Sequence, residues 1–183
     1  MTAHISKTVS NCFSAMRLIR SIRRSVSKAV LLSLVTALVL LRIDYGNATL
    51  AGLPARQLCW LQSVLHAAAR IVFSARKFDH VMPLLQEHNW LRVPEQIIFK
   101  LVSLVFRCLN GTAPVYLADS ITRAAHVDTR RSLRLRSSSS MAVVVPVTRR
   151  SKIGDRAFPV AAARAWNSLP SRQRSHCRLS GDT

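Results

Sequence analysis

Two runs of apolar residues at helical spacing, both within residues 53–111, most constrain what this chain can fold into. The first run comprises Leu58, Leu61, Leu65, Ala68, Ala69 and Val72. Residues three, four and seven apart share one face of an α-helix, so this run predicts an amphipathic helix with one buried side. The second run comprises Ile97, Ile98, Leu101, Val102, Leu104, Val105, Cys108 and Leu109. It predicts a helix that is apolar nearly all round, and two such helices need packing partners on several sides.

Shorter patterns predict the flanking elements. Pro94 suits the first turn of the second helix, and Gly111 suits its end, because glycine readily takes the left-handed conformation. An amphipathic helix near the N-terminus is predicted by Val9, Phe13, Met16, Ile19 and Ile22. Pro114 can start another helix through about Thr122, and a last helix is expected from about Val160 to Ser168. Residues 141–147 are a weak strand candidate, because they have no partner strand and contain a proline.

The segment Ala29–Leu41 is the one that a hydropathy plot would flag. It offers 13 uncharged residues, fewer than the ~20 that span a bilayer. We therefore predict a buried helix, which Ser25 or Ser27 can cap, rather than a membrane span.

Together these patterns predict an all-α fold, an irregular bundle of about five or six helices followed by a basic, partly disordered C-terminal arm. The expected divisions are a ragged N-terminus at residues 1–8, a helical domain at 9–125, and an arm at 126–183 that contains the short C-terminal helix.

The charge balance points to the class of partner. The chain carries 27 Lys and Arg against 8 Asp and Glu, a formal net charge of +19, and its pI is about 11.7. An enzyme for small molecules has no need of such a charge, whereas a polyanion does attract it, since each neutralised phosphate releases condensed counterions. A coding bias toward arginine is the alternative source of the charge.

Two groups of basic residues are candidates for contact with a nucleic-acid backbone. Arg17, Arg20 and Arg24 form a basic stripe on the predicted N-terminal helix. The second group comprises Arg130, Arg131, Arg134, Arg136, Arg149, Arg150 and Lys152. Contacts of this kind position a protein on RNA or an RNA–DNA duplex without reading its sequence. A solvated charged face is the alternative for each group.

The sequence predicts neither a metal site nor a cofactor. Cys12, Cys59, Cys108 and Cys177 are scattered, no Cys/His group has zinc-site spacing, and no glycine-rich phosphate motif is present. Unpaired cysteines favour a reduced, intracellular setting, with nucleus and cytoplasm both open. We expect Cys59 and Cys108 to be buried, and Trp90 and Trp166 to anchor the core. Asp79-His80 is interpreted as a turn with a helix cap, because no nucleophile accompanies it.

A series of short blocks runs in order across about residues 8–172. They are Arg42-Ile43-Asp44-Tyr45-Gly46-Asn47, Gly52-Leu53-Pro54, Ala67-Ala68-Ala69-Arg70, Asp79-His80, Trp90-Leu91-Arg92-Val93, Phe99-Lys100, Asn110-Gly111-Thr112-Ala113-Pro114 with Tyr116-Leu117, Gly154-Asp155-Arg156-Ala157-Phe158, Val160-Ala161-Ala162 and Ala165-Trp166-Asn167-Ser168-Leu169-Pro170. In order and spacing these blocks resemble the region after the palm in LINE-type (non-LTR) retrotransposon reverse transcriptases. The chain departs from that pattern at Gly46, where cysteine is usual.

The resemblance implies a thumb-like region beside the template–primer duplex. The family's catalytic aspartate pair, which would hold the metal ions of an RNA-directed DNA polymerase, belongs to the palm, and this chain has no Asp-Asp pair. We therefore expect a transposable-element polymerase fragment that binds nucleic acid and is not itself an enzyme. The alternative is an expressed orphan fragment whose basic face binds acidic membrane surfaces or nothing specific. A truncated gene model and an expressed fragment both remain open.

Overall fold

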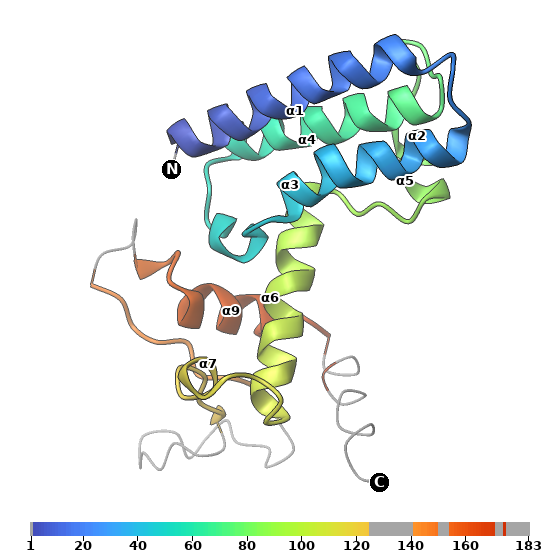
Figure 1. The fold of residues 1–183 in the computed structure, drawn as a ribbon. Coiled ribbons are helices and arrows are strands. Elements are labelled where there is room, and N and C mark those ends of the chain that lie inside the picture. The colour runs from blue at the N-terminus through green and yellow to red at the C-terminus, as the bar shows by residue number, and fades with distance from the viewer. Residues whose placement is uncertain (1, 125–140, 150–153, 171–173, 175–183) are drawn as a thin grey trace, which may run out of the picture. The chain divides into compact units, whose positions relative to one another are not determined.

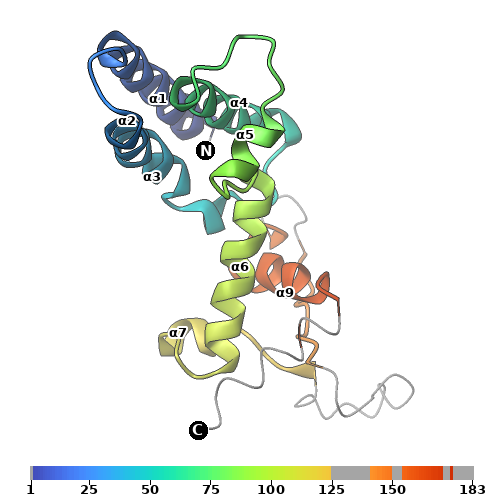
Figure 2. The ribbon, with the colours of Figure 1, turned by 90° about the vertical axis from the view of Figure 1, so that its right-hand side faces the viewer.

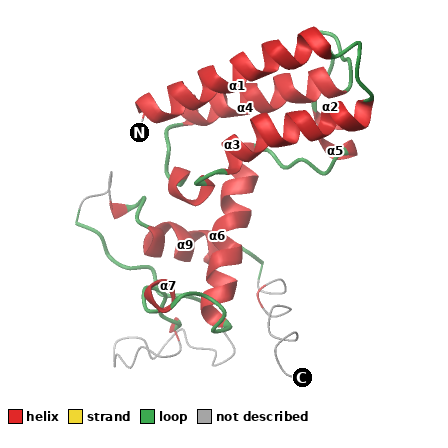
Figure 3. Cartoon of the chain, in the orientation of Figure 1, coloured by secondary structure: helices red, strands yellow, loops and turns green. Residues whose placement is uncertain are grey.

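The computed structural model describes residues 2–124, 141–149, 154–170 and 174. This part of the chain is helical, which confirms the predicted all-α class (Figures 1 and 3). Five of its helices are eight residues or longer: α1 (Thr2–Ile22), α2 (Lys28–Val35), α4 (Ala55–Val72), α6 (Val93–Leu109) and α9 (Phe158–Asn167). The shorter elements are the π-helical η1 (Thr36–Leu40), α3 (Leu41–Asp44), the 3-10 helix η2 (Asn47–Leu50), α5 (Met82–Glu87) and α7 (Val115–Ala118).

The chain divides into two compact units, and the division falls inside α6. Unit 1 comprises Met1–Asn47 and Leu53–Ile97, and unit 2 comprises Ala48–Gly52 and Ile98–Thr183. The sequence predicts one helical domain at 9–125 followed by an arm, whereas both units include parts of 9–125. Helix α6 contributes to both units, since Val93 and Ile97 are buried at its start and Leu101 and Val105 further along. One helix can therefore serve two cores.

In unit 1, α1 packs against α4 and runs in the same direction (Figures 1 and 2). Their N-terminal ends are joined by a hydrogen bond from Gln57 Nε2 to Thr2 Oγ1, 3.0 Å long. Both helices bury one stripe in the core. From α1 it comprises Ile5, Cys12, Met16 and Ile19, and from α4 it comprises Leu61, Val64, Leu65, Ala68, Ala69, Ile71 and Val72. The predicted helix over 58–72 is thus confirmed.

The N-terminal helix differs from the prediction in its start and its face. It begins at Thr2 rather than Val9, so residues 2–8 are helical and not ragged. Its buried face is centred on Cys12 and Met16, while Phe13 and Ile22 are 37% and 43% exposed. At 100° per residue those two side chains fall on opposite flanks of the buried stripe. The buried face of α1 includes Cys12 in their place, because cysteine packs as a small hydrophobic side chain.

The apolar segment after the first turn forms consecutive helical elements rather than one helix. Ser27 caps α2, its Oγ accepting from Val30 N at 3.4 Å, as one of the two predicted caps. A π-helical turn, η1, then separates α2 from α3. Among the described residues, no helix has both the length and the apolar character needed to cross a bilayer.

The predicted ends of α6 are confirmed, whereas α5 was not predicted. Pro94 lies in the first turn of α6, and Gly111, which follows the helix, has a φ of 70°. Helix α5 is only six residues long and begins with Met82-Pro83. A run this short gives no hydrophobic period to detect.

Unit 2 is built around Trp166 of α9, which is fully buried, as predicted for a core anchor. Its Nε1 donates to Met141 O at 2.7 Å and so ties α9 to residues 141–149. That segment is extended and forms one isolated bridge, between Arg123 and Val143, in place of a strand. Helix α9 agrees with the prediction within two residues, but α7 ends at Ala118 and stops short of the expected Thr122.

Candidate nucleic-acid interface

One end of unit 1 gathers basic side chains from segments that are distant in sequence. Because α1 and α4 run in the same direction, their C-terminal ends meet the start of α2 at this end (Figure 1). The basic residues there, which we call the basic end, are Arg20, Arg23, Arg24, Lys28, Arg70, Arg76 and Lys77. The acids in the same segments are Asp79 and Glu87. Cations are favourable here because a helix C-terminus carries about half a negative charge.

Both acids have partners within the unit, and they leave most of the cations uncompensated. Glu87 Oε1 lies 3.4 Å from Lys28 Nζ in an exposed ion pair, a kind that adds little stability. Asp79 Oδ2 accepts from Arg76 N at 2.6 Å. Arg20, Arg24 and Lys77 are exposed and make no ion pair with any carboxylate in the described ranges. These three side chains are therefore available to an anionic partner.

The structure places two members of the predicted basic stripe on α1 and the third just after the helix ends. Arg17 and Arg20 are exposed on α1, and Arg17 donates to Ser14 Oγ at 3.0 Å. Arg24 is also exposed, but it lies in the turn after Ile22, where α1 ends. The stripe therefore continues into the turn that leads to α2, and two of its members, Arg20 and Arg24, lie at the basic end.

The second predicted group is described only in part. Arg149 is exposed. The other members, Arg130, Arg131, Arg134, Arg136, Arg150 and Lys152, lie outside the described residues.

The sequence interpretation missed the contribution of Arg70, Arg76 and Lys77. The signal available for them was their position, since they lie in the last turn of a predicted helix and just beyond it. What could not be read from the sequence is that α1 ends beside them. Lys28 Nζ lies 4.5 Å from the centroid of the Phe73 ring, and this cation–π contact joins the start of α2 to the end of α4.

The loop between α4 and α5 ends in a closed turn rather than a helix cap. Asp79 Oδ2 accepts from Arg76 N, and Asp79 N donates to Arg76 O at 3.2 Å. Asp79-His80 is thus a turn, as expected, but the expected cap is absent because α5 begins only at Met82. Lys77 and Phe78 lie at the tip of this turn, and Phe78 is 89% exposed.

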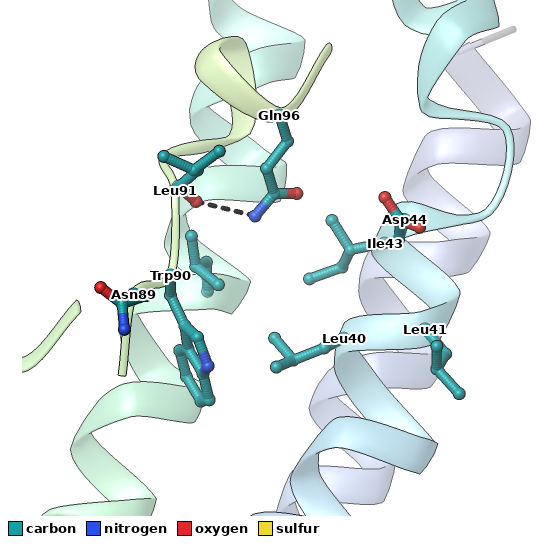
Figure 4. A pocket seen from close by; sticks show the side chains of 9 residues that line it. Leu40, Leu41, Ile43, Asp44, Asn89, Trp90, Leu91 and Gln96 are labelled. Carbon is teal, nitrogen blue, oxygen red and sulfur yellow. Dashed lines mark hydrogen bonds between the residues drawn. The ribbon is translucent and has the colours of Figure 1, made fainter. Parts of the chain in front are cut away.

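A separate pocket of about 270 Å³ opens on another part of unit 1 (Figure 4). Leu40 and Ile43 face Trp90 and Leu91 across it, and Gln96 Nε2 donates to Leu91 O at 2.7 Å. The predicted core anchor Trp90 is therefore half-buried in a pocket wall. Most of this lining is apolar, and it offers no pairing of a nucleophile with a base.

The described cysteines and histidines form no reactive cluster. No group of three or more His, Cys, Asp or Glu in the described ranges could hold a metal ion. Burial raises the pKa of the Cys12 thiol, and it also raises the pKa of the Cys108 thiol. Burial, followed by the nearby Arg70, lowers the pKa of His66, whose Nε2 lies 2.8 Å from Gln62 Nε2.

The expectation that Cys59 and Cys108 are buried was wrong at Cys59 and was met only in part at Cys108. Cys59 is exposed, because it lies on the side of α4 opposite Leu61 and Leu65, while Cys108 is half-buried. Cys177 lies outside the described residues.

Comparison with protein-family models, with curated proteins and with solved structures finds no match to this chain.

Proposed function

We propose that this chain is a helical nucleic-acid-binding fragment, derived from the thumb-side region of a LINE-type reverse transcriptase, without polymerase activity of its own. It contacts the phosphate backbone of RNA or of an RNA–DNA duplex. The observation that carries the proposal is the basic end of unit 1, where Arg20, Arg24 and Lys77 are exposed without an ion pair to a described carboxylate.

The net charge of this end supports an anionic partner even after every local negative charge is counted. Seven basic residues face two acids, a difference of five charges. The C-terminal ends of α1 and α4 subtract about half a charge each. About four positive charges remain on one end of a small bundle, and such a concentration of one sign attracts a polyanion and speeds its encounter.

The residues that carry the family resemblance are not the residues of the proposed contacts. Gly52 and Gly111 have positive φ angles, and Trp166 fills the core of unit 2. The proposed contacts come from other positions, on α1, in the turn after it and in the loop after α4.

The absence of polymerase chemistry is proposed from the sequence. The eight acids are Asp44, Asp79, Glu87, Glu95, Asp119, Asp128, Asp155 and Asp182. No two are adjacent in sequence, whereas two-metal phosphoryl transfer needs carboxylates that hold ions about 4 Å apart.

A binding experiment with two probes tests the proposed function. At low salt the protein should bind a fluorescently labelled RNA–DNA duplex in an anisotropy titration, and it should bind neutral and anionic vesicles more weakly. Addition of unlabelled duplex should displace the labelled probe. Failure to bind the duplex at low salt, or tighter binding to anionic vesicles than to duplex, would reject the proposal in favour of the orphan-fragment alternative.

A further inference from the structure

The tip of the loop between α4 and α5 exposes an aromatic ring among cations. Phe78 is 89% exposed, the highest value among the described aromatic side chains, compared with 62% for Phe99 and 37% for Phe13. Lys77 Nζ lies 5.6 Å from the centroid of the Phe78 ring. Arg76, which precedes them, is also exposed.

The local hydrogen bonds hold this ring away from the unit. Both bonds between Arg76 and Asp79, one through the Asp79 carboxylate at 2.6 Å and one through its N–H at 3.2 Å, close the turn around residues 77 and 78. Lys77 and Phe78 are thus the two central residues of a β-turn. Phe78 is exposed at this position, in a turn that Asp79 closes.

We propose that Phe78 stacks on an unpaired base of a nucleic acid, while Lys77 and Arg76 contact the flanking phosphates. The inference rests on the proposed nucleic-acid binding and adds to it a preference for single-stranded segments. Bases in a duplex are stacked on each other and present no free face, whereas an unpaired base does. An aromatic ring beside cations supplies both the stacking surface and the phosphate contacts that single strands require.

A membrane surface is the other partner that could take an exposed ring with basic neighbours. The turn fits it less well, because one ring is far smaller than the contiguous apolar patches that mark membrane or protein contacts.

The test compares the parent protein with three variants, Phe78→Leu, Phe78→Trp and Tyr45→Leu, on two nucleic-acid probes and on anionic vesicles. Phe78→Leu removes the ring, and Tyr45→Leu is the matched control, because Tyr45 is 81% exposed in the same unit and lies outside the basic end. The probes are a labelled single-stranded oligonucleotide and a blunt RNA–DNA duplex of the same length, each titrated by anisotropy. Thermal unfolding followed by circular dichroism checks that each variant remains folded, as is expected for exposed positions.

We expect Phe78→Leu to weaken single-strand binding by roughly five- to 150-fold, the range for one stacked base, and to leave duplex binding within about twofold. Phe78→Trp should restore the single-strand affinity. Tyr45→Leu should change neither. If the parent binds duplex but Phe78→Leu binds single strands as tightly as the parent, the stacking inference is wrong and the proposed function stands. If the parent binds neither probe, both fail. Vesicle binding that Phe78→Leu weakens, without a loss on single strands, would assign the ring to a membrane.

Discussion

The side chain of Asn167 forms hydrogen bonds with both the backbone N–H and the backbone C=O of Val143. Asn167 Oδ1 accepts from Val143 N at 3.1 Å, and Asn167 Nδ2 donates to Val143 O at 2.8 Å. Val143 is only 3% exposed, so water does not replace these bonds readily. A single asparagine on α9 therefore pairs with the extended segment as a neighbouring strand would.

Replacing this asparagine should destabilise unit 2. Asn167→Ala leaves a buried N–H and a buried C=O without their partners, which we expect to cost about 2–4 kcal/mol of the free energy of unfolding. The control is Asn11→Ala, at an exposed asparagine of α1, which should change the stability by less than about 0.5 kcal/mol. Urea unfolding of both variants measures the difference. Equal stabilities would show that the pairing with Val143 contributes nothing.

Two glycines offer a matched comparison of backbone strain and steric contact. Gly52 and Gly111 have φ angles of 69° and 70°. A Cβ on Gly52 would lie 2.8 Å from Arg156 Cγ, whereas one on Gly111 would meet nothing within 4 Å. Alanine at either position carries the left-handed penalty of about 1–2 kcal/mol.

Gly52→Ala should therefore be the more destabilising of the two, by roughly another 1 kcal/mol, because it also pushes Arg156 from its hydrogen bond to Ala51 O. The midpoints of thermal unfolding report this difference. A larger loss for Gly111→Ala than for Gly52→Ala would contradict the packing of Arg156 on Gly52.

Buried leucines on the two long helices test the assigned cores. Leu65 is fully buried on α4, and Leu101 is 3% exposed on α6. Leu65→Asp or Leu101→Asp would bury an unpaired charge, at a cost of several kcal/mol, which is comparable with the whole stability of a small domain. Leu18→Asp, at a position that is 72% exposed on α1, should melt close to the parent. Circular dichroism melts that do not separate Leu18→Asp from the other two would show that the buried faces are misassigned.

The outcome of the sequence interpretation followed the strength of each local pattern. Helices α4 and α6 were predicted well because their apolar residues repeat over several turns and because Gly111 marks an end. Helix α5 was missed because six residues carry no detectable period. Cys59 was misjudged because its neighbours are apolar while its own direction on α4 faces solvent. The local sequence pattern was therefore enough to predict α4 and α6, but it was not enough to predict α5 or the exposure of Cys59.

The candidate interface was predictable only in its α1 part. Arg17, Arg20 and Arg24 are close in sequence, so their spacing alone suggested a surface. Arg70 and Lys77 lie at the same end because α4 packs beside α1 in the same direction. The sequence of neither helix indicates that direction. The division inside α6 is of the same kind, since an all-round apolar helix indicates several partners without saying which.

Polymerase activity should be absent. We expect no template-dependent primer extension above a blank with either magnesium or manganese, because the sequence has no adjacent aspartates to hold two ions. An active reverse transcriptase run in parallel shows that the primer–template is competent. Clear extension by this protein, at a rate that scales with its concentration, would overturn the proposal.

If the basic end binds a phosphate backbone, duplex affinity should depend on salt concentration, which anisotropy titrations at several salt concentrations measure. For duplex DNA, the logarithm of the association constant should fall linearly with the logarithm of salt concentration, by about 0.9 per phosphate contacted. Three contacts, from Arg20, Arg24 and Lys77, would give a slope of about −2.7, and further contacts would make it steeper.

The double variant Arg20→Ala/Arg24→Ala should flatten this slope by about 1.8, two contacts at the same value each. Its charge-matched control, Arg42→Ala/Arg107→Ala, removes two exposed arginines outside the basic end and should leave the slope unchanged. A parent slope near zero, or an equal flattening in both double variants, would show that the basic end does not bind the phosphate backbone.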